Sequence, residues 1–105
     1  MIDHERVLAQ FKSLLGEKIP LDRMILFGSR ARGDAESRSD ADVILIVRRQ
    51  LNEQEQDHVS DCAWEAGYRD GLVVVPLVFT KEEWDEGPER ASLLHKAVDR
   101  DGVLV

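Results

Sequence analysis

The chain has little cysteine and no long hydrophobic run, and these absences exclude several classes of protein. A single cysteine, Cys62, cannot form an internal disulfide framework or supply a cluster of thiolates to a metal. The longest apolar stretch, from Leu72 to Phe79, is far shorter than the roughly 18 residues of a membrane-spanning helix. The first residues, from Met1 to Glu5, show neither the basic nor the apolar region of a signal peptide. We therefore expect a small cytoplasmic domain without a membrane segment.

Basic side chains are fewer than acidic ones. The 105 residues include 14 Lys and Arg against 21 Asp and Glu, which gives a net charge of -7. Non-specific binding to nucleic acid depends on Lys and Arg that neutralise phosphates, so this surplus argues against direct nucleic-acid binding. A basic protein partner, or a small phosphorylated ligand in a local basic pocket, suits the charge better.

The chain does have enough apolar surface for one hydrophobic core. Apolar residues make up 43% of the sequence, which excludes a disordered acidic tail. The length suits a single domain over residues 1–105 and is too short for two domains that each bury a core.

The hydrophobic pattern of the first half predicts two helices and two strands. Apolar residues at helical spacing follow Asp3 and predict an amphipathic helix that ends near Gly16. Short continuous apolar runs at Met24–Phe27 and Val43–Val47 predict two buried strands. A second amphipathic helix is expected after the second strand, and its inward stripe consists of Val59, Cys62, Ala63 and Ala66. On this stripe, Cys62 is expected to be a core residue and not a nucleophile.

The second half predicts a third strand and a short helix. The run Leu72–Phe79 is apolar on both faces and predicts a central strand, although Pro76 argues for a bulge or a place near the edge. Thr80 and Glu83 have the spacing of a capping box, so a short helix is expected to begin near Lys81.

The end of the chain predicts a last helix over Glu89–Arg100 and a terminal strand over Val103–Val105. The whole order predicts an α/β (α+β) fold, with a small mixed sheet and helices packed on it. The two strands on either side of residues 29–39 are too close in sequence for a helical crossover, so they are expected to pair antiparallel.

One segment carries the features of a phosphate site. The first strand ends in Gly28 and Ser29 and continues into a short basic turn with Arg30 and Arg32. Glycine permits a close approach of the backbone, and free N–H groups at the start of a helical turn favour an anion. The two arginines add positive charge at the same place.

The second part of this segment carries the features of a metal site. Asp40 and Asp42 lead into the second buried strand. Because alternate residues of a strand face the same side, both carboxylates are expected to project together. Two hard oxygen ligands beside a phosphate cradle suit a Mg²⁺ ion that bridges the phosphates of a substrate.

Gly28-Ser29, ten intervening residues and then Asp40-x-Asp42 resemble the signature of the nucleotidyltransferase superfamily related to DNA polymerase beta. More narrowly, the chain resembles the minimal nucleotidyltransferase (MNT) domains, which are often encoded beside a HEPN-domain protein. The resemblance implies the nucleotidyltransferase fold. It also implies that Gly28, Ser29 and Arg30 bind the nucleotide, and that Asp40 and Asp42 are catalytic and bind Mg²⁺.

The resemblance further implies an activity and a partner. The reaction is transfer of a nucleoside monophosphate, usually from ATP, to an acceptor hydroxyl with release of pyrophosphate. MNT domains of this kind can act as antitoxins, some by adenylylating a tyrosine of the HEPN partner. A HEPN-domain protein is therefore the expected partner.

The sequence departs from the family pattern at a third carboxylate. Active members usually carry this acid on the strand after the second helix, where the present chain has a purely apolar run and Val73 or Val75 is expected at that place. Asp70, Glu65 or Asp34 can replace the acid only if the fold brings one of them to the site.

Three functional hypotheses follow. The domain is an active transferase, a degenerate module that neutralises its partner by masking it, or the catalytic-core subunit of a split transferase. Trp64 lies off the inward stripe of the second helix, and Trp84 lies in the short helix near Lys81, whose pattern looks exposed. Each tryptophan either anchors an interface or packs on the sheet edge. The acidic residues of the second helix are a solvated face that could steer a basic partner.

Overall fold

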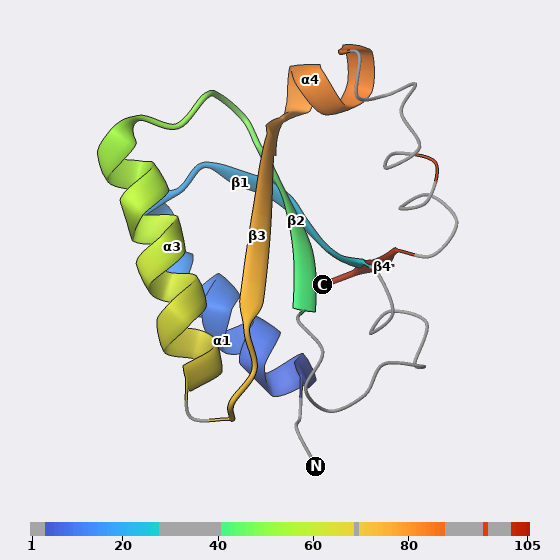
Figure 1. The fold of residues 1–105 in the computed structure, drawn as a ribbon. Coiled ribbons are helices and arrows are strands. Elements are labelled where there is room, and N and C mark those ends of the chain that lie inside the picture. The colour runs from blue at the N-terminus through green and yellow to red at the C-terminus, as the bar shows by residue number, and fades with distance from the viewer. Residues whose placement is uncertain (1–3, 28–40, 69, 88–95, 97–101) are drawn as a thin grey trace.

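The computed structural model describes residues 4–27, 41–68, 70–87, 96 and 102–105 (Figure 1). Its helices and strands are α1 (His4–Leu15), a 3-10 helix η1 (Gly16–Lys18), β1 (Leu21–Phe27), β2 (Ala41–Val47), α3 (Glu53–Tyr68), β3 (Val74–Thr80), α4 (Lys81–Glu86) and β4 (Val103–Leu104). The predicted helix over Glu89–Arg100 lies outside the described residues, apart from Lys96. None of the helices in the described ranges is long and apolar enough to cross a membrane.

The strands form a mixed sheet in the order β3-β2-β1-β4. β1 pairs antiparallel with β2 and with β4, whereas β2 pairs parallel with β3. Both the mixed sheet and the antiparallel pairing of the first two strands were predicted from the sequence, and both are confirmed. The parallel pair needs a long crossover, and α3 supplies it.

The prediction that the third strand is central is wrong. β3 is an edge strand of the described sheet, and several of its side chains are half-buried or exposed. Pro76 gives the physical reason. The amide of Ala41 donates to the carbonyl of Val73 (2.8 Å), so the alternation of a parallel ladder turns the backbone of Val74 and Pro76 away from β2. A residue without an N–H is tolerated at that outer edge and not between two strands.

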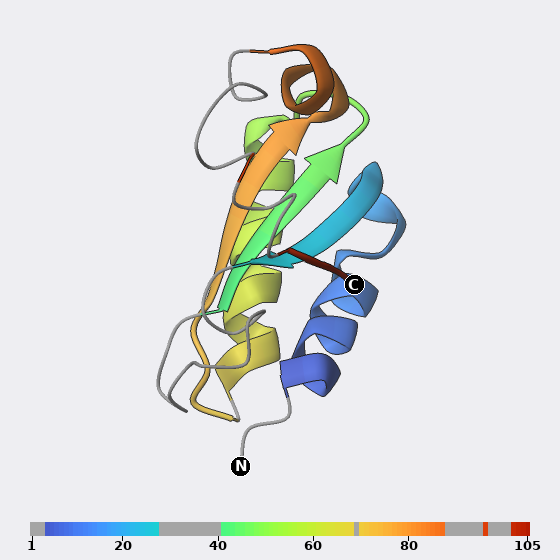
Figure 2. The ribbon, with the colours of Figure 1, turned by 90° about the vertical axis from the view of Figure 1, so that its right-hand side faces the viewer.

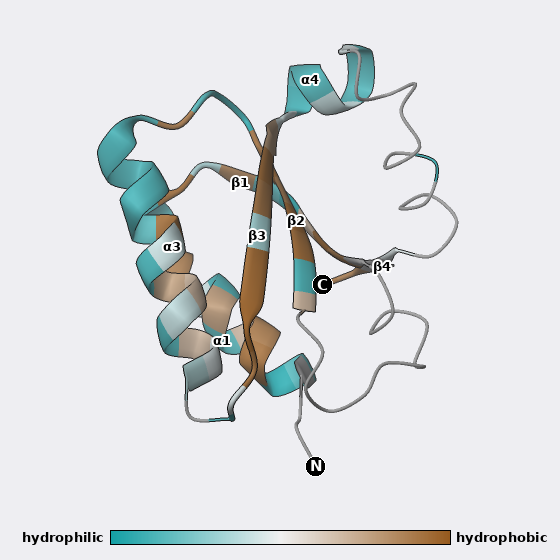
Figure 3. Ribbon diagram, in the orientation of Figure 1, coloured by the Kyte–Doolittle hydropathy of each residue, from teal (hydrophilic) through white to brown (hydrophobic). Residues whose placement is uncertain are grey.

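The main core lies between the sheet and the pair of helices α1 and α3, which pack against each other on one side of it (Figure 2). Alternate residues of β2 enter this core, and Phe11 of α1 and Val59 of α3 are fully covered there. Cys62 also lies in this core and is 4% exposed, which confirms its predicted place. The hydropathy of the elements agrees with this arrangement. The strands β1, β2 and β3 are apolar along most of their length, whereas α3 is polar over its first half (Figure 3).

A second, smaller core occupies the opposite face of the sheet. Ile44 and Ile46 of β2 are fully buried there against Trp84 of α4. Trp84 is 3% exposed, and its ring centroid lies 5.3 Å from that of Phe79. The alternative of an exposed Trp84 that anchors an interface is therefore wrong. In the sequence, α4 shows no apolar stripe, because Trp84 is its one apolar residue among five polar ones. The structure turns Trp84 toward the sheet.

The predicted capping box fixes the start of α4. The amide of Glu83 donates to Thr80 Oγ1 (3.0 Å), and the amide of Thr80 donates to Glu83 Oε1 (2.9 Å). These two bonds satisfy amide groups that the helix itself cannot pair. They hold α4 directly after β3, so that Trp84 covers the end of the second core.

Candidate functional site

Asp42 is the predicted site residue whose position the structure describes. It is the second residue of β2 and lies half-buried. Because its neighbours Ala41 and Val43 belong to the main core, Asp42 shares the opposite face with Ile44 and Ile46. The carboxylate therefore lies on the face of the sheet that α1 and α3 do not cover.

The ends of β1 and β2 meet at this point. Phe27, the last residue of β1, is the register partner of Asp42. The chain thus leaves β1 and enters β2 at the same end of the sheet, as the predicted phosphate and metal motif requires. Gly28, Ser29, Arg30 and Asp40 lie outside the described residues, and their roles stay predictions.

The register also shows which residue lies beside Asp42 on the next strand. On the parallel strand β3, the partner of Asp42 is Val75. Val73 precedes the strand and is 56% exposed. Of the two valines that the sequence left open, Val75 is the one beside Asp42. A half-buried hydrocarbon side chain therefore lies beside the carboxylate of Asp42.

Two of the acids considered as replacements lie elsewhere. Asp70 follows α3, and its carboxylate oxygens accept two hydrogen bonds from Arg6 of α1 at 2.7 and 2.9 Å. Glu65 is an exposed residue of α3, on the far side of the sheet from Asp42. Neither residue replaces the missing acid, and Asp34 lies outside the described residues.

The donor atoms near Asp42 agree in part with a magnesium site. A carboxylate at a strand start, with a second aspartate two residues earlier in the sequence, supplies the hard oxygen ligands that Mg²⁺ prefers. Val75 supplies none. The described residues contain no group of three or more His, Cys, Asp or Glu side chains that could hold a metal ion. These residues can therefore contribute to a site completed by substrate phosphates, and they do not form a full protein cage.

Cys62 is buried, and its surroundings disfavour the thiolate form. Burial raises the pKa of its thiol, and the negative charges of Glu65 and Asp61 raise it further. Its sulfur lies 3.5 Å from Nε2 of His58, one helical turn away. Since the thiolate is the reactive form, a buried thiol with a raised pKa reacts slowly.

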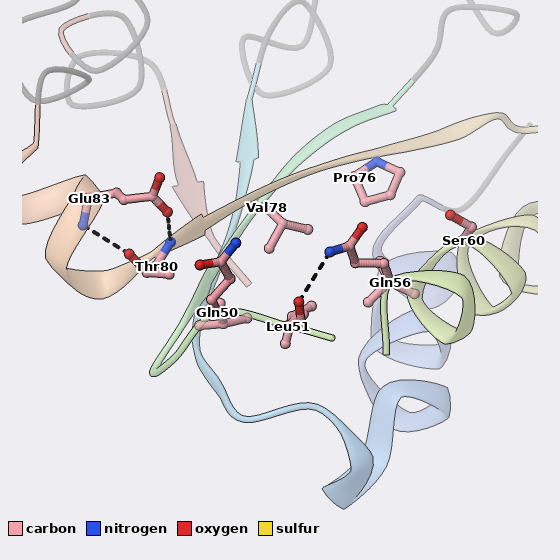
Figure 4. A pocket seen from close by; sticks show the side chains of 10 residues that line it. Gln50, Leu51, Gln56, Ser60, Pro76, Val78, Thr80 and Glu83 are labelled. Atoms are coloured by element: carbon pink, nitrogen blue, oxygen red, sulfur yellow. Dashed lines mark hydrogen bonds between the residues drawn. The ribbon is translucent and has the colours of Figure 1, made fainter. Parts of the chain in front are cut away.

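A cavity of about 380 Å³ lies beside β3, on the same side of the sheet as α3 (Figure 4). Gln50, Gln56 and Ser60 give it a polar wall, and Pro76 and Val78 give it an apolar one. Gln56 Nε2 donates to the carbonyl of Leu51 (3.1 Å), which fixes part of that wall. This cavity could not be predicted from the sequence, because its walls come from segments that are far apart in the chain.

A stacked aromatic pair on α3 was only half anticipated. The rings of Trp64 and Tyr68 stack with centroids 4.6 Å apart and planes inclined by 24°. Trp64 was singled out from the sequence and Tyr68 was missed. The signal was present, since residues four apart on a helix are neighbours on its surface.

The fold and the position of Asp42 define a nucleotidyltransferase-like domain. A model of the family described as "Nucleotidyltransferase domain" matches residues 6–98. The chain belongs to this family. It is also 31% identical over 77 residues to a protein of Methanocaldococcus jannaschii named "Putative protein adenylyltransferase MJ0141", in an alignment that spans 71% of this chain and 78% of that one.

Solved structures share the fold. One is a crystal structure of a toxin–antitoxin pair with AMP-PNP, which matches 98% of this chain and 72% of its own with a TM-score of 0.63 at 15% identity. Another, of a mutant of the toxin–antitoxin pair MntA-HpeT, matches 100% of this chain and 72% of its own with a TM-score of 0.61 at 15% identity. At these identities the likeness concerns the fold alone.

Proposed function

We propose that this domain transfers a nucleoside monophosphate from ATP to a hydroxyl on a partner protein, in the cytoplasm and with Mg²⁺. The observation that carries the proposal is the place of Asp42. It is the second residue of β2, on the face of the sheet opposite to α1 and α3 and at the end where β1 stops and the Gly28-Ser29 motif follows in the sequence. Membership of the nucleotidyltransferase family and the name of the archaeal relative support the same activity.

Each motif residue has a defined task in this proposal. Gly28, Ser29 and Arg30 hold the triphosphate, and Asp40 and Asp42 hold Mg²⁺. Bound magnesium supplies positive charge that stabilises the phosphates as negative charge develops on the leaving group. The acceptor oxygen forms a bond to the α-phosphorus, and the bond from that phosphorus to the bridging oxygen breaks to release pyrophosphate. The hydroxyl proton passes to a base.

The acceptor is proposed to belong to a toxin of the HEPN class, with this chain as the antitoxin of a HEPN/MNT pair. The support is the resemblance of the motif to MNT domains and the toxin–antitoxin structures that share the fold. In this arrangement the modified hydroxyl belongs to a tyrosine of the partner, and adenylylation inactivates the toxin.

A second candidate function rests on Val75. An acid beside Asp42 would add a metal ligand and a base, and valine provides neither. A domain without this acid could neutralise its partner by masking it, with nucleotide bound or absent. Masking is therefore the alternative that the register of β2 and β3 favours.

Isothermal titration of Mg·ATP into the isolated chain tests the nucleotide site first. Binding is expected for the wild type and a loss of binding for the Asp40→Asn/Asp42→Asn variant. The matched control is Asp57→Asn/Asp61→Asn, which removes two exposed carboxylates of α3 and should leave binding unchanged. Binding that survives the change at Asp40 and Asp42 would contradict the proposed site.

Mass spectrometry of the co-expressed partner then separates the two functions. Transfer leaves a permanent mass increase on the partner, and the Asp40→Asn/Asp42→Asn variant should abolish it. Neutralisation that persists in this variant without any mass increase would establish masking in place of catalysis.

A further inference from the structure

An exposed aromatic surface lies between α3 and the edge strand β3. Trp64 and Tyr68 are 67% and 66% exposed, although large aromatic side chains are usually well covered in a folded domain. They line a groove of about 480 Å³ together with Val73, Val74 and Pro76. Val73 is itself 56% exposed, so the groove is an apolar surface open to solvent.

The stacking of the two rings prepares this surface for binding. The rings of Trp64 and Tyr68 stack on each other with their centroids 4.6 Å apart. Ordering flexible side chains costs free energy on association, and a stacked pair has already lost much of that freedom. The outer faces of such rings also bind a guanidinium or ammonium group through cation–π contact.

The acidic residues around the two rings favour a partner with positive charge. α3 contains five acidic residues and no Lys or Arg. Asp57, Asp61 and Glu65 are exposed and lie within two turns of Trp64 on the same helix. Glu55 differs, because its carboxylate is held by Arg49 at 2.7 Å. The groove is thus an apolar surface beside three carboxylates of α3 that form no ion pair within the described ranges, and a second copy of this chain would bring the same negative charge against it.

The backbone of β3 argues against addition of a partner strand. Pro76 turns its ring nitrogen toward the outer edge, where a paired strand would need an N–H donor. The amide of Thr80 donates to Glu83. Recognition at this edge must therefore depend on side chains in the groove.

We propose that the aromatic groove of α3 and β3 binds a segment of a partner protein in which an apolar anchor is flanked by Lys or Arg. The anchor fills the space between Trp64 and Val73. The cationic groups stack on the rings and pair with Asp57, Asp61 and Glu65. This binding goes beyond the proposed function, since it holds whether or not the chain transfers a nucleotide.

Selection of random peptides displayed on phage against the full chain tests the proposal. The selected peptides are expected to combine Lys or Arg with an apolar anchor, and one of them is then synthesised for titration. Trp64→Ala/Tyr68→Ala should weaken its binding by at least about tenfold, as for central aromatic anchors. The matched control is Leu104→Ala, which removes another exposed apolar side chain, 69% exposed on β4, and should leave the affinity unchanged.

Charge is tested separately at low salt. Asp57→Asn/Asp61→Asn/Glu65→Gln should weaken the same peptide severalfold, whereas Glu5→Gln/Glu82→Gln/Glu86→Gln removes as many exposed charges from α1 and α4 and should have little effect. Several results would overturn the proposal. They are a selection that yields no binder, a selection of acidic peptides, unchanged affinity in the aromatic double variant, and self-association of the wild type that this variant abolishes.

Discussion

Asp42 and Val75 are register partners on neighbouring parallel strands, and their side chains share the face of the sheet that α1 and α3 leave uncovered. One carboxylate and one hydrocarbon chain thus lie side by side at the start of β2. Val75 is therefore the described residue at which we expect the third acid of the family pattern. The pairing also shows which substitution would supply this acid.

Val75→Asp is expected to create a metal-dependent gain in stability. The new carboxylate faces that of Asp42, so without metal the two negative charges repel and the free energy of unfolding falls. A divalent cation that bridges them stabilises the folded state according to its affinity. Thermal unfolding with and without MgCl₂ should show a larger magnesium-dependent rise in Tm for Val75→Asp than for the wild type.

The control for this experiment is Val78→Asp in the same strand. Val78 is 39% exposed and is three residues from Val75, so it belongs to the opposite face of β3. A magnesium effect of equal size in both variants would be non-specific binding of cations. No effect in Val75→Asp would show that the face of Asp42 does not hold a metal, and it would strengthen masking as the function.

Local features of the fold were predictable because local chemistry decides them. The capping box of Thr80 and Glu83 is a short-range pattern, and the sequence alone predicts the start of α4 from it. The place of β3 depends on which strand it pairs with, and this contact is remote in sequence. Pro76 carried the correct signal for an edge, but the apolar run on both sides of it favoured a centre. The run is apolar because one face meets Trp84 and the other lines the open grooves beside α3.

The candidate site was predictable in composition and not in arrangement. Asp42 was selected by its spacing from Gly28 and Ser29, which needs no three-dimensional information. The choice between Val73 and Val75 needs the register of two strands separated by a whole helix. The stack of Trp64 on Tyr68 follows from helical spacing, but its exposure depends on what the rest of the chain covers.

Gly67→Ala is expected to destabilise the domain strongly. A Cβ at this position would lie 1.9 Å from the carbonyl oxygen of Leu72, where the chain turns back from α3 toward β3. The backbone cannot yield easily, because the amide of Leu72 donates to the carbonyl of Gly67 at 3.1 Å. Overpacking of this kind costs about 1–3 kcal/mol or more of the free energy of unfolding, measurable by urea titration.

Gly16→Ala is the comparison for this variant. Gly16 has a positive φ of 56°, and nothing lies within 4 Å of a Cβ placed there. The cost is then the left-handed backbone alone, about 1–2 kcal/mol. Equal stability of Gly67→Ala and the wild type would contradict the close approach of Leu72.

Truncation of the two tryptophans is expected to lower the free energy of unfolding by very different amounts. Trp84→Ala removes a buried ring from the second core, packed between Phe79 and the isoleucines of β2, and should cost about 3–5 kcal/mol of the free energy of unfolding. Trp64→Ala removes an exposed ring and should cost less than about 1 kcal/mol. Urea unfolding of both variants checks this. A large loss in Trp64→Ala would mean that the ring is needed for folding and not for binding.

Glu55 is expected to make the stability of the domain sensitive to acid. Hydrogen bonds from Arg49, with a further bond from the amide of Asn52, lower the pKa of Glu55 from 4.5 to about 2. The unfolded chain takes up a proton on this group below about pH 4.5, whereas the folded chain resists protonation down to about pH 2. The stabilising contribution of Glu55 is therefore complete above about pH 4.5 and is lost as the pH falls toward 2.

Comparison with Glu55→Gln isolates this contribution, because glutamine keeps the shape of the side chain and cannot titrate. Urea unfolding at a series of pH values between 7 and 3 should show a smaller loss of stability for Glu55→Gln than for the wild type. Glu53→Gln removes an exposed carboxylate from the same first turn and leaves the pair of Arg49 and Glu55 in place, so its profile should follow that of the wild type. Parallel profiles for the wild type and Glu55→Gln would show that the pair with Arg49 does not persist in solution. The start of α3 would then depend on the bond from the amide of Glu55 to Asn52 Oδ1 at 2.8 Å.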